Sequence, residues 1–79
     1  MSPSTGISNV SLSDYRYFLS KIGCKKVGVE GGHEKWTRHD LTRPIIVQTP
    51  VDPVPEFIVR NGLRNLGITK KAFLSILHS

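Results

Sequence analysis

Residues 24–39 have the sequence CKKVGVEGGHEKWTRH, the clearest structural pattern in the chain. Two valines alternate with other residues in its first part, as they do along a β-strand, and the pair Gly31-Gly32 follows. Glycine adopts the positive φ angles of a tight hairpin turn without strain, so this pair suits a two-residue connection between antiparallel strands. We therefore predict a strand over residues 24–30, a turn, and a second strand over residues 33–39.

The second strand of this hairpin has two faces of different character. Because side chains alternate along a strand, Trp36 lies on one face. The other face carries His33, Lys35, Thr37 and His39. Trp36 is the large apolar group, so we interpret it as a core residue in preference to a platform on which a base stacks. The face that carries His33 is then predicted to meet solvent or a ligand.

An amphipathic helix precedes the hairpin. Apolar residues at spacings of three, four and three form one buried stripe, made up of Leu12, Tyr15, Leu19 and Ile22. Ser11 or Ser13 can cap the start of this helix. Gly23 supplies the left-handed residue that commonly follows a helix end, so the helix is predicted to stop there.

The second half of the chain contains a third strand and further helical segments. Residues 44–49 are rich in β-branched side chains, and residues 50–55 form a stiff loop because three prolines prevent a helix there. Helical spacing of apolar residues resumes after the loop, at Val59, Leu63 and Leu66 and then at Phe73, Ile76 and Leu77. Gly67 can end a first helix, and Thr69 can cap a last short one.

The expected fold class is α+β, with a helix, a three-stranded antiparallel sheet, and one or two helices packed on one face. The double-stranded-RNA-binding domain has the same order of elements. A chain of 79 residues with 38% apolar content fits one domain, which we place at residues 11–79. Residues 1–10 are mostly polar and are predicted to form a flexible leader.

Composition excludes several classes of protein. The chain has one cysteine, Cys24, so an intramolecular disulfide is excluded, and we interpret Cys24 as a small buried hydrophobe. The three histidines show no zinc-binding spacing, and no run of about 18 apolar residues could span a membrane. The N-terminus has no signal-peptide pattern. These features predict a reduced, cytoplasmic protein without a zinc site or a membrane partner, and we expect no cofactor.

The net charge of the chain is positive. Eleven Lys and Arg residues against six Asp and Glu give a net charge of +5 and an isoelectric point near 9.8. Residues 57–79 contain four cations and no carboxylate. This balance favours a nucleic-acid partner, although an ordinary solvated surface remains open as its explanation.

A family resemblance is carried by Gly31-Gly32-His33-Glu34-Lys35-Trp36. These residues resemble the motif of the small HicA toxins, also called YcfA-like proteins, in which Gly-Ser-His is followed two or three places on by an apolar or aromatic residue. The segments FLSKIG at residues 18–23 and LRNLGI at residues 63–68 also match the family in order, and the resemblance covers roughly residues 12–77. Gly32 stands where the family usually has serine.

The resemblance implies an activity and a partner. HicA proteins are the toxins of type II toxin–antitoxin systems, and they cleave mRNA as metal-independent endoribonucleases on a double-stranded-RNA-binding-domain-like fold. A HicB antitoxin holds the toxin inactive, so we expect a HicB-like antitoxin to cover His33 and the basic surface. The family's catalytic histidine corresponds to His33, and neither His39 nor His78 occupies the motif position.

RNA cleavage without metal requires a group that removes the proton of a ribose 2′-hydroxyl. An imidazole suits this task near neutral pH, so His33 is the candidate general base. Lys35 on the same predicted face can meet the phosphate as a positive charge. The candidate RNA-binding residues are Lys25, Lys26, Lys35, Arg38 and Arg43. Glu34 is rejected as a second acid–base group because adjacent strand residues point to opposite faces.

Two other functions remain open at this point. A non-catalytic RNA-binding module would have the same order of elements and the same basic charge, and it would recognise the shape of duplex RNA. A protein-interaction domain would use the open sheet face and the cations to bind an acidic partner. Fold does not decide between these functions. Without the family motif, His33 would be interpreted as a polar surface residue.

Overall fold

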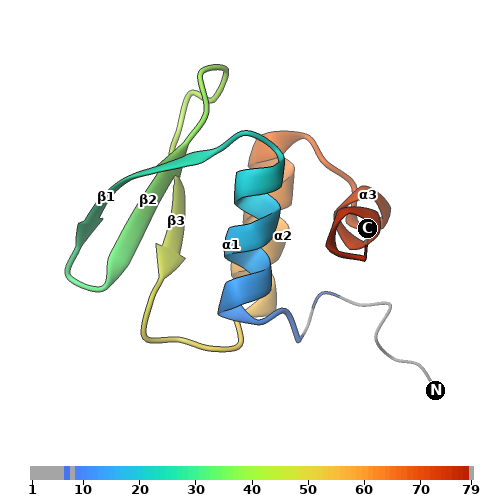
Figure 1. Cartoon of the computed structure of the whole chain (residues 1–79), viewed down its shortest axis with the longest axis horizontal. Coiled ribbons are helices and arrows are strands. Elements are labelled where there is room, and N and C mark those ends of the chain that lie inside the picture. Colours follow the sequence, from blue (N-terminus) through green and yellow to red (C-terminus); the bar gives the residue numbers. More distant parts are fainter. Residues whose placement is uncertain (1–6, 8, 79) are drawn as a thin grey trace.

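The computed structural model of the chain describes residue 7 and residues 9–78. This part of the chain forms helices and strands (Figure 1) in the order α1 (Leu12–Lys21), β1 (Lys25–Glu30), β2 (His33–Thr37), β3 (Ile45–Gln48), α2 (Glu56–Leu66) and α3 (Lys70–Leu77). The predicted α+β class is confirmed, and the C-terminal segment forms two helices rather than one. Within the described residues no helix is long and apolar enough to cross a membrane.

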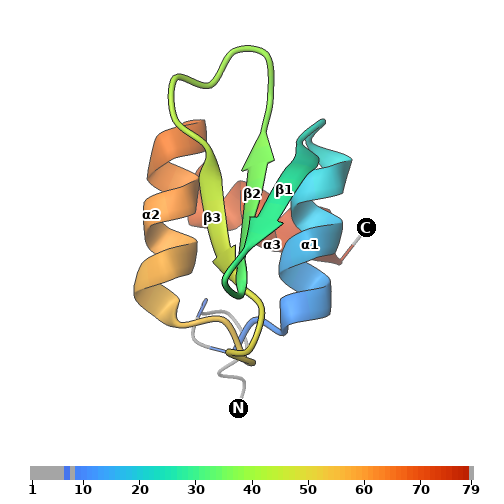
Figure 2. The ribbon, with the colours of Figure 1, turned by 90° about the vertical axis from the view of Figure 1, so that its left-hand side faces the viewer.

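The strands form one antiparallel sheet in the order β1-β2-β3, with helices on one of its faces. Figure 1 shows the layers from the side: the sheet, then α1 and α2, then α3. Figure 2 looks onto the open face of the sheet, with α2 beside β3, α1 beside β1, and α3 behind. The open face is therefore the one that the helices of the described chain leave uncovered.

The helix ends carry the predicted caps. The Ser11 hydroxyl accepts a hydrogen bond from the backbone N–H of Asp14 at 3.0 Å, and the Thr69 hydroxyl caps α3 in the same way at 3.1 Å. These bonds satisfy N–H groups that a helix leaves unpaired in its first turn. Gly23 and Gly67 follow the ends of α1 and α2 with φ angles of 90° and 70°, the left-handed conformation that glycine adopts freely.

The core lies between the covered face of the sheet and the helices. The predicted stripe of α1 contributes to it together with Phe18, which packs edge-to-face on Phe73 of α3 with 4.6 Å between ring centroids. Trp36 of β2 and Ile45 and Val47 of β3 are the buried apolar residues of the sheet. No residue of β1 is buried. The core is therefore built by the helices and two of the three strands.

The packed domain begins earlier than the predicted boundary at residue 11. Ile7 and Val10 fall within the predicted flexible leader, but both are buried in the core. The C=O of Val10 accepts a hydrogen bond from the N–H of Val54 at 2.8 Å. Burial of apolar side chains stabilises this segment, although its polar composition predicts a loose one. The remainder of the predicted leader, residues 1–6 and 8, lies outside the described residues.

β2 is shorter than predicted, which moves His39 off the strand. The strand ends at Thr37, and a turn follows in which the N–H of Leu41 donates to the C=O of Arg38 at 2.9 Å. His39 lies in this turn and is exposed. The prediction that His39 shares a strand face with His33 is therefore wrong, because the turn ends the alternation of side chains two residues earlier.

α1 meets α2 where Tyr15 lies against Gly62. Tyr15 is fully buried, and its hydroxyl has no hydrogen-bond partner within the described part of the chain. Burial raises the pKa of Tyr15, because the interior disfavours a charged phenolate. A Cβ built on Gly62 would overlap the Tyr15 hydroxyl oxygen. The Tyr15 hydroxyl of α1 therefore requires glycine at position 62 of α2.

Gly62→Ala is expected to destabilise the fold by about 1–3 kcal/mol, the usual cost of overpacking a filled core. In a Tyr15→Phe chain the same substitution is expected to be neutral or stabilising by up to about 1 kcal/mol, because alanine favours a helix over glycine. The next nearest atom, Tyr15 Cζ, lies 3.5 Å from the built Cβ, an ordinary contact. Urea denaturation of the wild type, the two single variants and the double variant measures the free energy of unfolding of each chain. If Gly62→Ala costs the same with tyrosine and with phenylalanine at position 15, the steric explanation is wrong.

Candidate functional site

His33 begins β2 directly after the predicted glycine turn. Gly31 and Gly32 have φ angles of 59° and 80°, so both central residues of the turn are left-handed, as in type I′ hairpins. The register of β1 and β2 places Glu30 opposite His33. The turn thus holds His33 beside the tip of the hairpin, at one end of the sheet.

The imidazole of His33 is exposed, as the alternation predicts, and it contacts its own turn. Its Nδ1 lies 3.2 Å from the C=O oxygen of Gly31. A carbonyl oxygen only accepts hydrogen bonds, so Nδ1 carries the proton in this contact. The lone pair of the neutral ring is then on Nε2. In the neutral tautomer that makes this hydrogen bond, Nε2 is the nitrogen that can accept a proton.

The open face around His33 is formed by residues of all three strands. Cross-strand partners share a face, so Glu30 of β1 and Gln48 of β3 flank His33 on either side. Lys35 is exposed on the same face, two residues along β2, which corresponds to about 7 Å. The site consists of one imidazole with a carboxylate, an amide and an ammonium group around it.

Sequence reasoning misses Glu30 and Gln48 as neighbours of His33. A signal for Glu30 is present, because a two-residue hairpin turn pairs the residues on either side of it. Gln48 has no such signal, since nothing in residues 38–44 sets the register between β2 and β3. Only the folded sheet therefore places the amide beside the imidazole.

Four of the five predicted RNA-binding residues lie at the other end of the sheet from His33, namely Lys25, Lys26, Arg38 and Arg43. The two lysines begin β1, opposite the last two residues of β2. His33 is therefore about 10–13 Å away from them along the strand. The two arginines belong to the connection between β2 and β3, beyond that same end. Of the five predicted cations, Lys35 is the one that the fold brings beside His33.

Arg38 is engaged in hydrogen bonds within the fold. Its Nε and Nη2 donate to the two carboxylate oxygens of Asp40 at 2.6 and 3.0 Å, and its Nη1 donates to the C=O of Ile22 at 2.9 Å. The hydrogen bond from Arg38 holds the pKa of Asp40 below its usual value. Arg38 thus joins the end of α1 to the connection after β2, and a phosphate contact would compete with these bonds.

The covered face of β2 carries a buried ion pair. Glu34 is 3% exposed and accepts hydrogen bonds from Nη2 and Nε of Arg16 at 2.6 and 3.2 Å and from Trp36 Nε1 at 2.9 Å. Burial alone would raise the pKa of Glu34, but these hydrogen bonds and the charge of Arg16 outweigh it, so the pKa lies below its usual value. Glu34 therefore joins α1 to the sheet and points away from His33, and Trp36 is a core residue, as predicted.

Thr49 holds the glycine turn beside the end of β3. Its backbone N–H and its hydroxyl both donate to the C=O of Gly32, at 2.8 and 3.1 Å. Gly32 itself is left-handed, with a φ angle of 80°. The position therefore favours glycine over the serine that the HicA motif usually contains, because side chains are strained in this conformation.

Gly32→Ser is expected to destabilise the fold by about 1–2 kcal/mol, the cost of a left-handed residue with a side chain. The built Cβ would lie 3.5 Å from Pro50 Cδ, so backbone strain rather than a clash sets this cost. Gly28→Ser is the matched control, expected to change stability by less than about 0.5 kcal/mol, since its Cβ position is open. Thermal unfolding followed by circular dichroism compares the two chains. An equal effect of both substitutions would rule out strain at Gly32 as the cause.

The side chains around His33 can accept a proton and attract an anion. His33 offers Nε2 as the acceptor, and Lys35 offers a positive charge on the same face. Among the residues that the structure describes, no group of three or more His, Cys, Asp or Glu side chains is placed to hold a metal ion. Comparisons with protein-family models, with curated proteins and with solved structures find no match to this chain.

Proposed function

We propose that this chain is an endoribonuclease that cleaves mRNA without metal, with His33 as the general base. The observation that carries the proposal is the contact of His33 Nδ1 with the Gly31 carbonyl, which leaves Nε2 of this exposed residue to accept a proton. The resemblance of the same motif to the HicA toxins supports a role as the toxin of a type II toxin–antitoxin system in the cytoplasm.

Cleavage proceeds by attack of the ribose 2′-oxygen on the adjacent phosphorus. His33 Nε2 takes the proton of the 2′-hydroxyl as the new oxygen–phosphorus bond forms, and the bond from phosphorus to the 5′-oxygen breaks. The leaving oxygen takes a proton from solvent. Lys35, on the same face, stabilises the negative charge that develops on the phosphate. The products end in a 2′,3′-cyclic phosphate and a 5′-hydroxyl, and DNA is not cleaved because it lacks the nucleophile.

The test is incubation of the purified chain with a single-stranded RNA oligonucleotide in the presence of a metal chelator. The same oligonucleotide with 2′-deoxy sugars is incubated beside it. We expect fragments ending in a cyclic phosphate from the RNA and no fragments from the deoxy strand. A His33→Ala chain purified in parallel controls for contaminating nuclease, and equal cutting by that chain would reject the proposal.

The proposed protein partner is a HicB-like antitoxin that covers the open face of the sheet. His33 and Lys35 share that face, so one bound protein can keep RNA from both. Co-purification with the antitoxin is expected to abolish cleavage and to slow exchange of the His33 ring proton with solvent. An inhibited complex in which this ring proton exchanges as fast as in the free chain would contradict inhibition by occlusion.

A non-catalytic RNA-binding module is the alternative, and the positions of the cations favour it. Four of the five predicted RNA-binding residues lie away from His33, so RNA bound to them need not meet the imidazole. This function predicts salt-dependent binding of duplex RNA without any product. Binding and cleavage measured on the same duplex substrate distinguish the two functions.

A further inference from the structure

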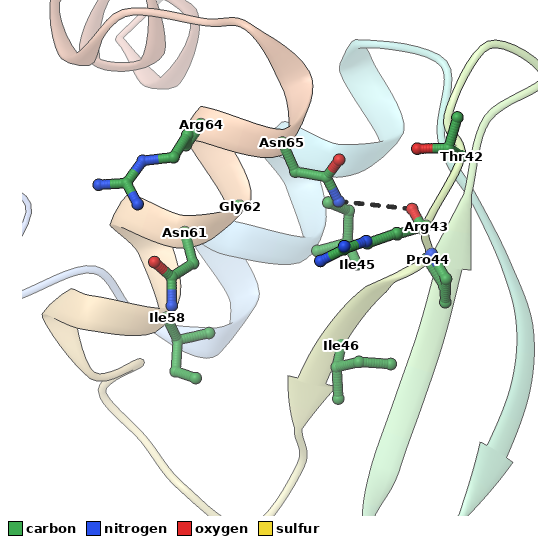
Figure 3. Close-up of a pocket in the computed structure, with 10 residues that line it drawn as sticks. All are labelled: Thr42, Arg43, Pro44, Ile45, Ile46, Ile58, Asn61, Gly62, Arg64 and Asn65. Carbon is green, nitrogen blue, oxygen red and sulfur yellow. Dashed lines mark hydrogen bonds between the residues drawn. The ribbon is translucent and has the colours of Figure 1, made fainter.

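A groove of about 650 Å³ lies between β3 and α2 (Figure 3). Its apolar lining includes Ile45 and Ile46 of β3 and Ile58 of α2. β2 is on the other side of β3, so the groove follows the outer edge of the sheet. His33 and Lys35 do not line it, and the groove adjoins the candidate catalytic site through Ile46, the cross-strand partner of Lys35.

The outer edge of β3 presents backbone groups that no strand pairs. The N–H of Thr49 donates towards β2, and strand alternation then directs the N–H and C=O of Ile46 away from β2. Within the described part of the chain these two groups of Ile46 have no hydrogen-bond partner. An extended chain placed in the groove can supply both partners.

The two edges of the sheet differ in whether they can accept another strand. β1 starts with two lysines, and its register shifts between Lys26 and Gly28. Charges and bulges of this kind are the usual protection of an edge strand. β3 has no charged residue and pairs with β2 in regular register. The edge beside the groove is therefore the one open to strand addition.

The rim of the groove is positively charged. Arg43 before β3 and Arg64 of α2 line it, and neither guanidinium forms an ion pair among the residues that the structure describes. Figure 3 shows the side chain of Arg43 extending across the groove towards α2. No Asp or Glu lines the groove, while Asn61 and Asn65 add amide groups to it. This rim is complementary to carboxylates.

We propose that the groove binds an extended acidic segment of a partner protein, which adds to β3 as a fourth strand. The backbone of the segment pairs with Ile46, its apolar side chains pack on the isoleucines, and its carboxylates bind Arg43 and Arg64. RNA is the other polyanion that the arginines could attract, but its backbone lacks the N–H donors and C=O acceptors of a strand. The proposal goes beyond RNA cleavage and does not depend on it.

The probe is a synthetic peptide of alternating valine and glutamate, titrated into the full ¹⁵N-labelled chain and followed by NMR. Bound peptide is expected to shift the Ile46 amide resonance and to slow its hydrogen exchange. Replacing Arg43 and Arg64 together by alanine is expected to weaken binding about tenfold, because two partly exposed ion pairs are lost. A peptide with lysine in place of glutamate, and one with alternate backbone nitrogens methylated, are each expected to bind at least about tenfold more weakly.

Arg60→Ala is the matched control for the arginine variants. Arg60 lies on α2 but pairs with Glu56 and does not line the groove, so its replacement is expected to leave peptide binding unchanged. Absence of any protection at Ile46, or equal binding of the lysine peptide, would overturn the proposal. A single-stranded RNA oligonucleotide is titrated in the same way. If RNA shifts the groove amides and the glutamate peptide does not, the groove is a nucleic-acid site and the proposal is wrong.

Discussion

His33→Gln is expected to lower the rate of RNA cleavage about 10²- to 10⁴-fold, the contribution that a positioned general base typically makes. Glutamine keeps a polar side chain at the same place but cannot take up a proton. His33 is exposed and contacts its own turn, so the free energy of unfolding is expected to change by less than about 0.5 kcal/mol. Single-turnover cleavage of a labelled RNA measures the rate, and thermal unfolding measures the stability.

His39→Gln is the matched control for this experiment. His39 is also exposed, but it lies beyond the end of β2, at the opposite end of the sheet from His33. Its replacement is expected to leave the cleavage rate unchanged. Full activity in the His33→Gln chain would show that another group accepts the proton. An equal loss of activity in both variants would show that His33, beside the glycine turn, has no role that His39 lacks.

Arg16→Ala is expected to destabilise the fold by about 2–4 kcal/mol, which lowers the folding equilibrium constant about 30- to 900-fold. Removing Arg16 leaves the carboxylate of Glu34 buried, with the Trp36 N–H as its remaining donor. The expected cost is below the usual range for a fully buried pair because the Arg16 side chain is 39% exposed. Urea denaturation at neutral pH measures the loss.

A chain with Arg16→Met and Glu34→Gln together is the control for this prediction. Removing both charges leaves no uncompensated carboxylate, so its stability is expected to lie closer to that of the wild type than the stability of Arg16→Ala does. A double variant at least as unstable as Arg16→Ala would show that lost packing, and not the buried charge, is the cause.

The ion pair of Glu34 also predicts how stability depends on pH. The pKa of Glu34 is depressed in the folded chain, so its contribution is complete above the unfolded value of about 4.3 and is lost as the pH falls through the folded value. The free energy of unfolding of the wild type should therefore fall more steeply below about pH 4 than that of a Glu34→Gln chain. The free energy of unfolding of both chains is measured by urea denaturation at several pH values. If it falls with pH equally in the two chains, Glu34 is not the cause of the acid sensitivity.

The order of elements is predictable from local signals in the sequence. The glycine pair at residues 31–32 forms a turn, and Ser11 and Thr69 cap the helices that directly follow them. Each of these signals affects only residues close by in the sequence, and the structure contains each of them. The start of the domain is not predictable in this way. Ile7 and Val10 are isolated apolar residues in a polar segment, and long-range packing buries them. Such packing leaves no periodic pattern in the sequence.

The candidate site is predictable only where it depends on one hairpin. The exposure of His33 and the position of Lys35 follow from the turn and from alternation along a single strand. The positions of the other predicted cations do not follow from such local patterns, because a charged residue does not by itself indicate where the fold places it. The antiparallel register sends Lys25 to the far end of β2, and Arg38 turns back onto the end of α1 through the Ile22 carbonyl. Neither effect has a signal near the residue concerned.

The loop between β3 and α2 is hydrogen-bonded to the segment before and at the start of α1, through Asp52 to Leu12 at 3.0 Å and Val54 to Val10 at 2.8 Å. At its other end the same loop begins with Thr49, which holds the glycine turn. One loop thus joins Val10, before the first helix, to Thr49, which holds the turn that His33 contacts. The hairpin turn and the start of the domain are therefore fastened to the two ends of one proline-rich loop, although more than 20 residues of sequence separate them.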